Sequence, residues 1–242
     1  MKNAYRFCLP ITVVAAMFSI PAAHAQQDAV APVESDASPA RLEAAASRHV
    51  NDAVEVVHRL ENDPRMRSAI GRAKGIFIIP SYGRAAVGVG AAGGTGLLLV
   101  RHSDGSWSDP AFYTTGGLSL GLQAGAQGGA FVMLLNNDKA IKEFYKKNNF
   151  SINANAGLTV LNWSRMAEGT AGTGDVLVWS DTKGLFGDLV TVELNDVRYS
   201  SRMNNAYYRR TLAASDVVAG KVENPQADAL VRAVAAVNDT RK

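Results

Sequence analysis

Apolar side chains recur at helical spacing over residues 39–60, the first strongly patterned stretch of the chain. At about 100° per residue they fall within an arc of about 120°, the width of a stripe that faces a protein core. Arg48 and Asp52 stand four residues apart outside this arc, as expected on a solvated helix surface. The pattern predicts a structural helix with this stripe: Leu42, Ala46, His49, Val50, Ala53, Val56, Val57 and Leu60.

A second helix is predicted where Asp63 and Pro64 restart the chain, because Asp is a good N-cap and Pro fits the first helical turn. It extends to about Lys74 and ends at Gly75. The same apolar periodicity predicts three more helices, over 138 to about 147, about 202 to 213, and 225 to 237.

Side chains alternate in size and polarity in the middle of the chain, where all 22 glycines lie between Gly71 and Gly220. In segment 117–127 one phase holds Leu and Ala and the other holds Ser, Gly and Gln, which gives an apolar face backed by a small, polar one. Glycine in a strand marks a bend, a bulge or a close approach of another group. We predict a bent, closely packed sheet with strands over 76–79, 83–92, 95–101, 112–127, 130–135, 150–162, 175–180 and 185–199.

The order of elements, a helix, many strands and then helices, predicts one α+β domain over residues 39–242. Its body is a glycine-rich, mainly antiparallel β-sheet packed with N-terminal, central and C-terminal helices. Whether this sheet closes into a barrel stays open. We expect Pro80 to end the first strand and Ser180–Gly184 to form the turn between the last two.

The N-terminus has the three parts of an export signal: a basic start, an apolar run and a small-x-small cleavage site at Ala23–Ala25. We predict a signal peptide over 1–25, cleaved before Gln26, and a flexible linker over 26–38. The only cysteine, Cys8, lies in the signal, so the mature protein forms no disulfide. The predicted location is periplasmic or secreted.

Residues that carry covalent chemistry are scarce in the mature sequence. Segment Gly88–Gly93 matches the G-x-G-x-x-G dinucleotide pattern, but a second strand is predicted after it, whereas pyrophosphate binding needs a helix N-terminus there. The histidines lack metal-ligand spacing, and we expect Asp175, Asp181, Asp188 and Glu193 to be solvated charges. We predict a non-enzymatic protein with no cofactor and no metal site. A hydrolase with an unrecognised site is the enzyme alternative, which activity screening tests.

Positive charge gathers in one stretch, although the predicted mature protein is nearly neutral, with 23 basic and 22 acidic residues once Lys2 and Arg6 are removed. Residues 64–103 contain six Lys or Arg and no acid. Their few aromatics give no platform for nucleic acid. On the predicted helix 64–74, basic residues flank a narrow apolar stripe, as in a helix that lies in a lipid interface. We predict that its lipid-binding residues are Arg65, Arg67, Arg72, Lys74, Met66 and Ile70. In the alternative interpretation, the stripe faces the protein core.

Several short motifs follow one another along the chain: Ala73–Pro80, Trp107–Phe112, Gly117–Gly125, Trp179–Phe186, Asn205–Tyr208 and Gly220–Pro225. Their residues and order resemble the SYLF-domain (Ysc84-type) lipid-binding family. Two departures from the family pattern stand out. Asp188 occupies a place where small residues are usual, and Arg209 occupies one where a glycine is common.

The resemblance implies phospholipid binding through a basic amphipathic helix near the start of the domain, which matches 64–74 here. Eukaryotic members attach the domain to a Src-homology module, bind phosphoinositides and associate with actin, so the lipid headgroup is not carried over to an exported chain. We predict a peripheral protein that binds anionic phospholipid surfaces. Two alternatives are an envelope protein that binds a protein partner and an outer-membrane barrel, the second disfavoured by the helices at both ends of the domain.

Overall fold

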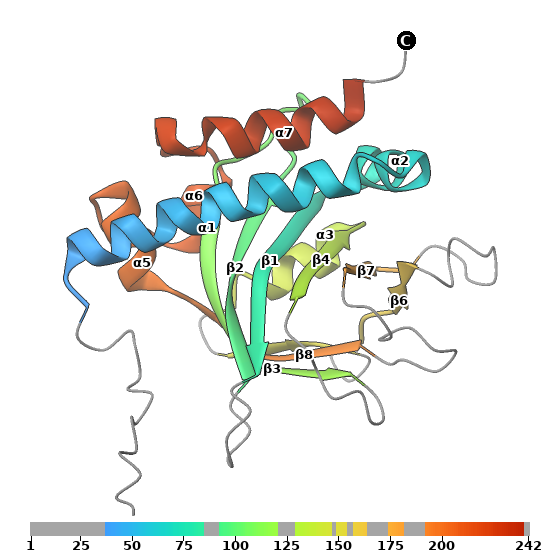
Figure 1. Cartoon of the computed structure of the whole chain (residues 1–242), viewed down its shortest axis with the longest axis horizontal. Coiled ribbons are helices and arrows are strands. Elements are labelled where there is room, and N and C mark those ends of the chain that lie inside the picture. Colours follow the sequence, from blue (N-terminus) through green and yellow to red (C-terminus); the bar gives the residue numbers. More distant parts are fainter. Residues whose placement is uncertain are drawn as a thin grey trace, which may run out of the picture. The chain divides into compact units, whose positions relative to one another are not determined.

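The structure, a computed structural model, describes residues 37–84, 92–120, 129–146, 149–153, 157–163, 174–181 and 192–239 (Figure 1). The first two helices begin as predicted: the Ser38 side chain accepts the backbone N–H of Arg41, and the Asp63 side chain accepts that of Arg65. The helices are α1 (Pro39–Leu60), α2 (Pro64–Arg72), α3 (Asp138–Glu143), α5 (Ser201–Tyr208), α6 (Ala214–Val218), the short 3₁₀ helix η2 (Pro225–Ala227) and α7 (Asp228–Asp239).

The strands join in one sheet with the order β5-β8-β3-β2-β1-β4-β7-β6. Every pair is antiparallel except β6 and β7, which run parallel. Strand β6, at one edge, also contacts β8, next to the other edge, so the sheet is nearly closed into a barrel. The predicted α+β class is confirmed. The strands are β1 (Gly75–Arg84), β2 (Ala92–Val100), β3 (Ala111–Leu120), β4 (Gly129–Leu135), β5 (Phe150–Ile152), β6 (Val160–Asn162), β7 (Val176–Ser180) and β8 (Val192–Tyr199).

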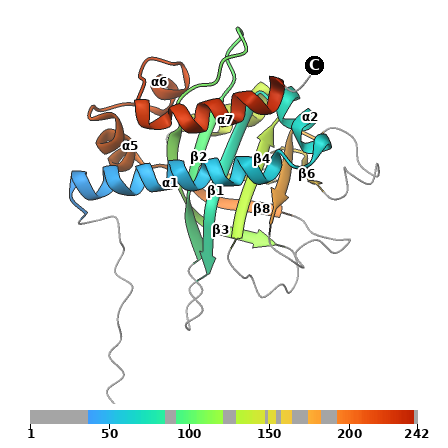
Figure 2. The same ribbon diagram turned by 45° about the horizontal axis from the view of Figure 1, so that its top comes forward.

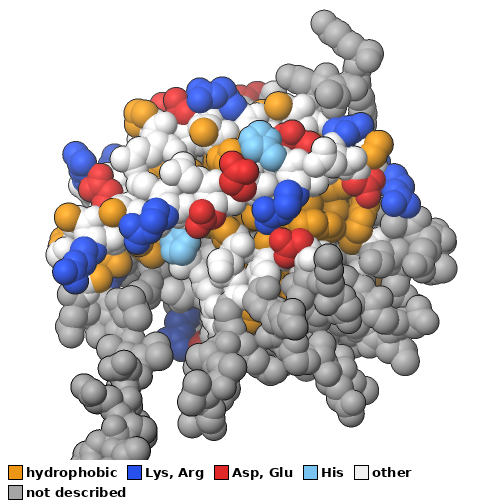
Figure 3. Space-filling model, viewed as in Figure 1, with side chains coloured by type: hydrophobic (Ala, Val, Ile, Leu, Met, Phe, Trp, Pro, Cys, Tyr) orange, Lys and Arg blue, Asp and Glu red, His pale blue; other side chains and the backbone are white. Residues whose placement is uncertain are grey.

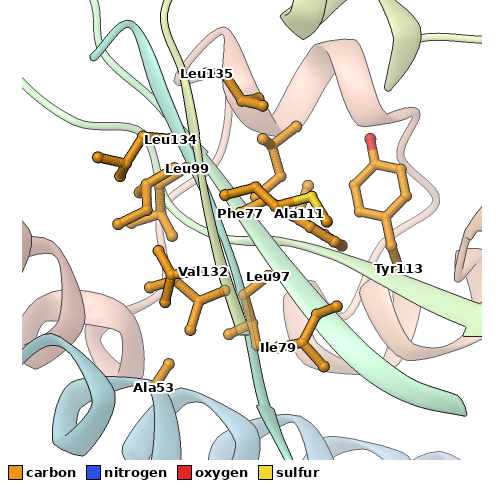
Figure 4. Close-up of a cluster of buried hydrophobic side chains, with 14 of the residues drawn as sticks. Ala53, Phe77, Ile79, Leu97, Leu99, Ala111, Tyr113, Val132, Leu134 and Leu135 are labelled. Carbon is orange, nitrogen blue, oxygen red and sulfur yellow. The ribbon is translucent and has the colours of Figure 1, made fainter. Parts of the chain in front are cut away.

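Helices α1 and α7 lie side by side across β1, β2 and β4 (Figure 2). The predicted apolar stripe of α1 is buried there, and only His49 among its members stays half-exposed. Figure 4 shows Ala53 of α1 on the side of the sheet that carries Val132, with Tyr113 on the opposite side. Both faces of the central strands are therefore buried, which explains their near-continuous apolar sequences.

The face that points away from α1 packs an aromatic cluster. The ring of Phe77 lies 5.9 Å from that of Tyr113 and 4.9 Å from that of Phe144, and Phe144 lies 5.0 Å from Phe150. A Cβ added at Gly96 would lie 2.0 Å from Cζ of Phe77, so only glycine leaves room for this ring. The close approach expected of the strand glycines is found here.

Three of the sequence motifs meet where the C-terminal segments contact the β2–β3 connection. Oδ2 of Asp109 accepts the backbone N–H of Asn224 at 2.7 Å, and the Tyr208 hydroxyl donates to the Pro110 carbonyl at 2.8 Å. The fully buried Asn204 side chain accepts from the backbone N–H of Phe112 at 3.0 Å and donates to its carbonyl at 2.8 Å. These motifs therefore hold α5 and η2 to the sheet.

Four sequence predictions need correction. Pro80 does not end the first strand: β1 continues to Arg84, and the ladders shift register between Ile78 and Gly83, which accommodates the missing N–H. Residues 83–84 thus belong to β1 and not to the separate strand predicted over 83–92, and residues 85–91 lie outside the described ranges. The helix predicted over 202–213 ends at Tyr208, and a separate short helix, α6, follows. The strand predicted over 150–162 consists of β5 and β6, separated along the chain. The predicted turn at Ser180–Gly184 lies mostly outside the described residues.

Candidate membrane-binding surface

Helix α2 is held to the sheet by Arg101, the residue that follows β2. Its Nη1 donates to the Gly71 carbonyl and its Nη2 to the Ile70 carbonyl, both at 3.0 Å. The guanidinium also lies 4.6 Å from the centre of the Trp107 ring. Burial lowers the pKa of Arg101, but arginine keeps its charge in proteins. A fixed positive charge therefore meets the negative end of the α2 dipole.

Two of the predicted basic residues, Arg65 and Lys74, form exposed ion pairs. Nε of Arg65 lies 3.5 Å from Oδ1 of Asp63, and Nζ of Lys74 donates to Oδ1 of Asp138 at 2.9 Å. The side chains of Arg65 and Lys74 are 62% and 51% exposed. Exposed pairs of this kind contribute about 0–1 kcal/mol. An anionic group from outside can therefore compete for both cations.

The other two basic residues, Arg67 and Arg72, hydrogen-bond within the α1–α2 region. Nη1 of Arg67, which is half-buried, donates to the Glu61 carbonyl. Arg72 is exposed, and its Nη1 donates to Oγ of Ser68 at 2.5 Å. Both partners are uncharged, so these hydrogen bonds orient the guanidinium groups without neutralising them.

The apolar stripe of α2 faces the protein. Met66 and Ile70 are 1% and 0% exposed and belong to the hydrophobic core. Helix α2 also packs against α7. Burial of these two side chains anchors the helix, so any contact of α2 with a membrane in this conformation depends on its basic residues. The lipid-binding role of the six residues stays a prediction.

A polar pocket of about 310 Å³ opens beside the last turn of α2. Arg72 lines it from the helix, Asn136 and Asn137 from the β4–α3 turn, and Asp175 from the position before β7. Asp175 is not the solvated charge we expected. Its carboxylate accepts the backbone N–H of Thr159 at 2.7 Å and the side-chain amide of Asn137 at 2.5 Å.

Asp181, also expected to be solvated, bridges separate elements. Its Oδ1 accepts the backbone N–H of Ala130 at 2.8 Å, and its Oδ2 accepts from Nη2 of Arg59 at 3.1 Å. Asp188 lies outside the described residues, and the side chain of Glu193 is not among those described.

The parts of the chain that the structure describes contain no group of three His, Cys, Asp or Glu residues arranged to hold a metal ion. The strand predicted over 95–101 is found as β2, which begins at Ala92 inside the glycine pattern, so a strand and not the helix that dinucleotide binding needs follows the pattern. No helix within the described ranges combines the length and apolar character of a membrane span. On the face over α1 and α7, acidic and basic side chains are interspersed (Figure 3).

Together the fold and this surface define a small α+β domain with a nearly closed sheet and with Arg65 and Arg72 exposed on α2. A family model described as "Las17-binding protein actin regulator" matches residues 116–237, half of the chain. The chain belongs to this family, the Ysc84 or SYLF family, whose members are binding and regulatory domains.

Curated relatives support this assignment over most of the domain. The chain is 30% identical over 159 residues to the bovine (Bos taurus) "SH3 domain-containing YSC84-like protein 1", covering 64% of this chain and 46% of the relative. It is 30% identical to the Saccharomyces cerevisiae "Protein YSC84" over 167 residues, 66% of this chain and 35% of the relative. It also resembles the yeast "LAS seventeen-binding protein 3", at 30% identity over 161 residues, covering 64% and 35% of the two chains. The chain thus spans between about a third and a half of the curated relatives it matches.

Sequence reasoning missed the roles of Arg101 and Asp175. Arg101 contacts carbonyls 30 and 31 residues earlier in the chain, and Asp175 accepts from residues 16 and 38 positions away. No local spacing marks such contacts. The one sequence signal for Arg101 was its place as the last basic residue of the acid-free stretch 64–103.

Proposed function

We propose that this protein is an exported, non-enzymatic phospholipid-binding protein that contacts anionic membrane surfaces through α2. Arg65, Arg67, Arg72 and Lys74 supply the attraction for headgroup phosphates. Met66 and Ile70 hold the helix in place from the core side. The proposed location is periplasmic or secreted, with peripheral attachment to a membrane.

The observation that carries the proposal is the division of α2 into a buried apolar side and an outward basic side. Arg65 and Arg72 of α2 and Lys74, two residues after the helix ends, are exposed, while Met66 and Ile70 are buried. A helix whose apolar side is already covered gains little by insertion into lipid. Its binding is then electrostatic and reversible, as for a peripheral protein.

The expected binding to an anionic membrane is modest in strength. Each cation near an anionic surface contributes about 1 kcal/mol, so four contribute about 4 kcal/mol before the surface pairs with Asp63 and Asp138 are exchanged. Raising the salt concentration from about 0.1 M to about 1 M shortens the Debye length from about 10 Å to about 3 Å. Binding to phosphatidylglycerol vesicles should therefore weaken steeply over this range.

The test is co-sedimentation with phosphatidylglycerol vesicles of a variant in which Arg65, Arg67, Arg72 and Lys74 are all changed to Gln. We expect binding to be lost while the urea unfolding midpoint stays close to that of the wild type. A matched control removes the same charge elsewhere: the four exposed residues Arg41, Arg48, Arg210 and Arg232 are changed to Gln.

The control separates a local surface from net charge. If both quadruple variants lose binding equally, net charge and not α2 governs the attraction. If the α2 variant binds as well as the wild type, the proposed surface is wrong.

A second candidate function is the binding of a protein partner. Relatives are named as Las17-binding and as SH3 domain-containing proteins, which points to protein partners for those proteins. Recovery of one stoichiometric partner in an affinity pull-down, together with no binding to anionic vesicles, would favour this function over the first.

Export has its own test. Expression of the whole chain in a bacterium with a Sec system should yield a product that lacks residues 1–25 and begins at Gln26, as measured by intact mass. A product of full length in the cytoplasm would contradict the proposed location.

A further inference from the structure

The pocket beside α2 is lined by side chains of opposite charge. Arg72 lines it from the helix, and Asp175 lines it from the position before β7. Asn136 and Asn137 of the β4–α3 turn also line it. A pocket with a guanidinium and a carboxylate suits a ligand that itself carries both charges, because each ionic group finds a charged hydrogen-bonding partner.

The Asp175 carboxylate is built to stay ionised. The backbone N–H of Thr159 and the side-chain amide of Asn137 donate to it, and the first of these is the main cause that lowers the pKa of Asp175. Its side chain is 18% exposed, so it is fixed in place but reachable. Nζ of Lys139 lies 3.9 Å from Oδ2, too far for a hydrogen bond.

The carboxylate retains capacity for a ligand. A carboxylate has about four acceptor positions, and within the part of the chain that the structure describes the donors at Asp175 are the Thr159 backbone and hydroxyl and the Asn137 amide. A primary ammonium carries three N–H donors and can use the remaining position. A quaternary ammonium has no N–H and cannot.

We infer that this pocket recognises the phosphoethanolamine group, with the phosphate at Arg72 and the primary ammonium at Asp175. This rests on the proposed function, in which Arg72 already meets lipid phosphates, and it adds a headgroup preference. The same chemistry occurs in phosphatidylethanolamine and in free glycerophosphoethanolamine, so the experiment distinguishes the two sources.

The vesicle experiment holds the anionic lipid constant. Vesicles contain phosphatidylglycerol with either phosphatidylethanolamine or phosphatidylcholine in the same proportion. We expect the wild type to bind the ethanolamine mixture about fivefold more tightly, a difference of about 1 kcal/mol. Equal binding to the two mixtures overturns the inference while leaving the proposed function intact.

Single variants locate the preference. Arg72→Gln and Asp175→Asn should each abolish the fivefold difference. Arg65→Gln is the matched control: this exposed cation of the same helix does not line the pocket, so the variant should bind both mixtures more weakly and keep the ratio. An unchanged ratio in Arg72→Gln overturns the assignment, even if Asp175→Asn fails to fold.

A soluble probe separates the headgroup from the membrane. Glycerophosphoethanolamine, titrated into the wild-type protein, should shift the amide NMR signals of Asn136, Asn137 and Asp175, and glycerophosphocholine should not. Shifts together with no binding to any anionic vesicle would refute the proposed function but support the pocket, with the free compound as ligand. No shifts with either compound would overturn the pocket.

Discussion

Arg101 is expected to decide whether α2 stays packed in its place on the sheet. We predict that Arg101→Met removes the two hydrogen bonds to the Ile70 and Gly71 carbonyls, each 3.0 Å long. Hydrogen bonds from a charged donor contribute about 1.5 kcal/mol or more each. Against this stands Nε of Arg101, a buried donor without a partner among the described residues, whose desolvation costs about 1 kcal/mol. The net loss is about 2 kcal/mol, which makes opening of α2 about 30-fold more frequent.

Hydrogen exchange measures this opening directly. The amide of Arg67 donates to the Asp63 carbonyl and that of Ala73 to the Ala69 carbonyl, so amides over residues 67–73 report on α2. In Arg101→Met their protection should fall about 30-fold, and in Arg101→Lys, which retains the charge but not the two-armed geometry, by less. Binding to anionic vesicles should weaken in the same order.

The matched control is Arg198→Met, because Arg198 pairs with the half-exposed Asp196 on β8 and should not affect α2. The reasoning fails if protection of residues 67–73 falls no more than that of β4, since the variant would then destabilise the whole fold. It also fails if Arg101→Lys loses as much protection as Arg101→Met.

Two further predictions concern the C-terminal segments. Burial raises the pKa of Asp109 from 3.8 to about 6. The folded state therefore favours protonated Asp109, and the resulting stabilisation is complete below about pH 4 and is lost as the pH rises through 6. Asp109→Asn should therefore gain stability relative to the wild type between pH 4.5 and pH 7.5 in urea unfolding, and a constant difference would contradict this. Arg209 has a left-handed backbone, φ 52°, so Arg209→Gly should raise the urea midpoint, whereas Arg209→Ala, which lacks that freedom, should not. A lower midpoint for the Gly variant would show that the ion pair of Arg209 with Glu43 outweighs the strain.

The local elements could be predicted because their signals are local. The bounds of α1 follow from a 3.6-residue stripe between the Ser38 cap and Leu60, and the structure has the same bounds. The start of α2 follows from Asp63 and Pro64. The departure noted at Arg209 falls at a position with a left-handed backbone, φ 52°, a conformation that glycine adopts readily.

The elements that failed depend on distant partners. A proline ends a strand only where its missing N–H would have to bond to a neighbouring strand. At Pro80 the register shifts between β1 and its neighbours, so no ladder hydrogen bond from residue 80 is needed. The sheet order, with β1 between β2 and β4 and with β8 beside β3, brings together strands far apart in sequence. A single sequence holds no record of such pairings.

The candidate site also depends on contacts with distant parts of the chain, which the sequence does not reveal. Spacing on a helix defines which side chains share a face, but it does not say what covers that face. Met66 and Ile70 satisfied the pattern of a lipid-inserted stripe and of a core stripe equally, and the structure places them in the core. The basic side chains of Arg65 and Arg72 stay exposed on α2, without the apolar stripe that would insert into lipid. A surface of this kind binds anionic lipid more weakly as the salt concentration rises, whereas a helix inserted through its apolar side does not. The salt dependence of binding therefore distinguishes the two modes of attachment.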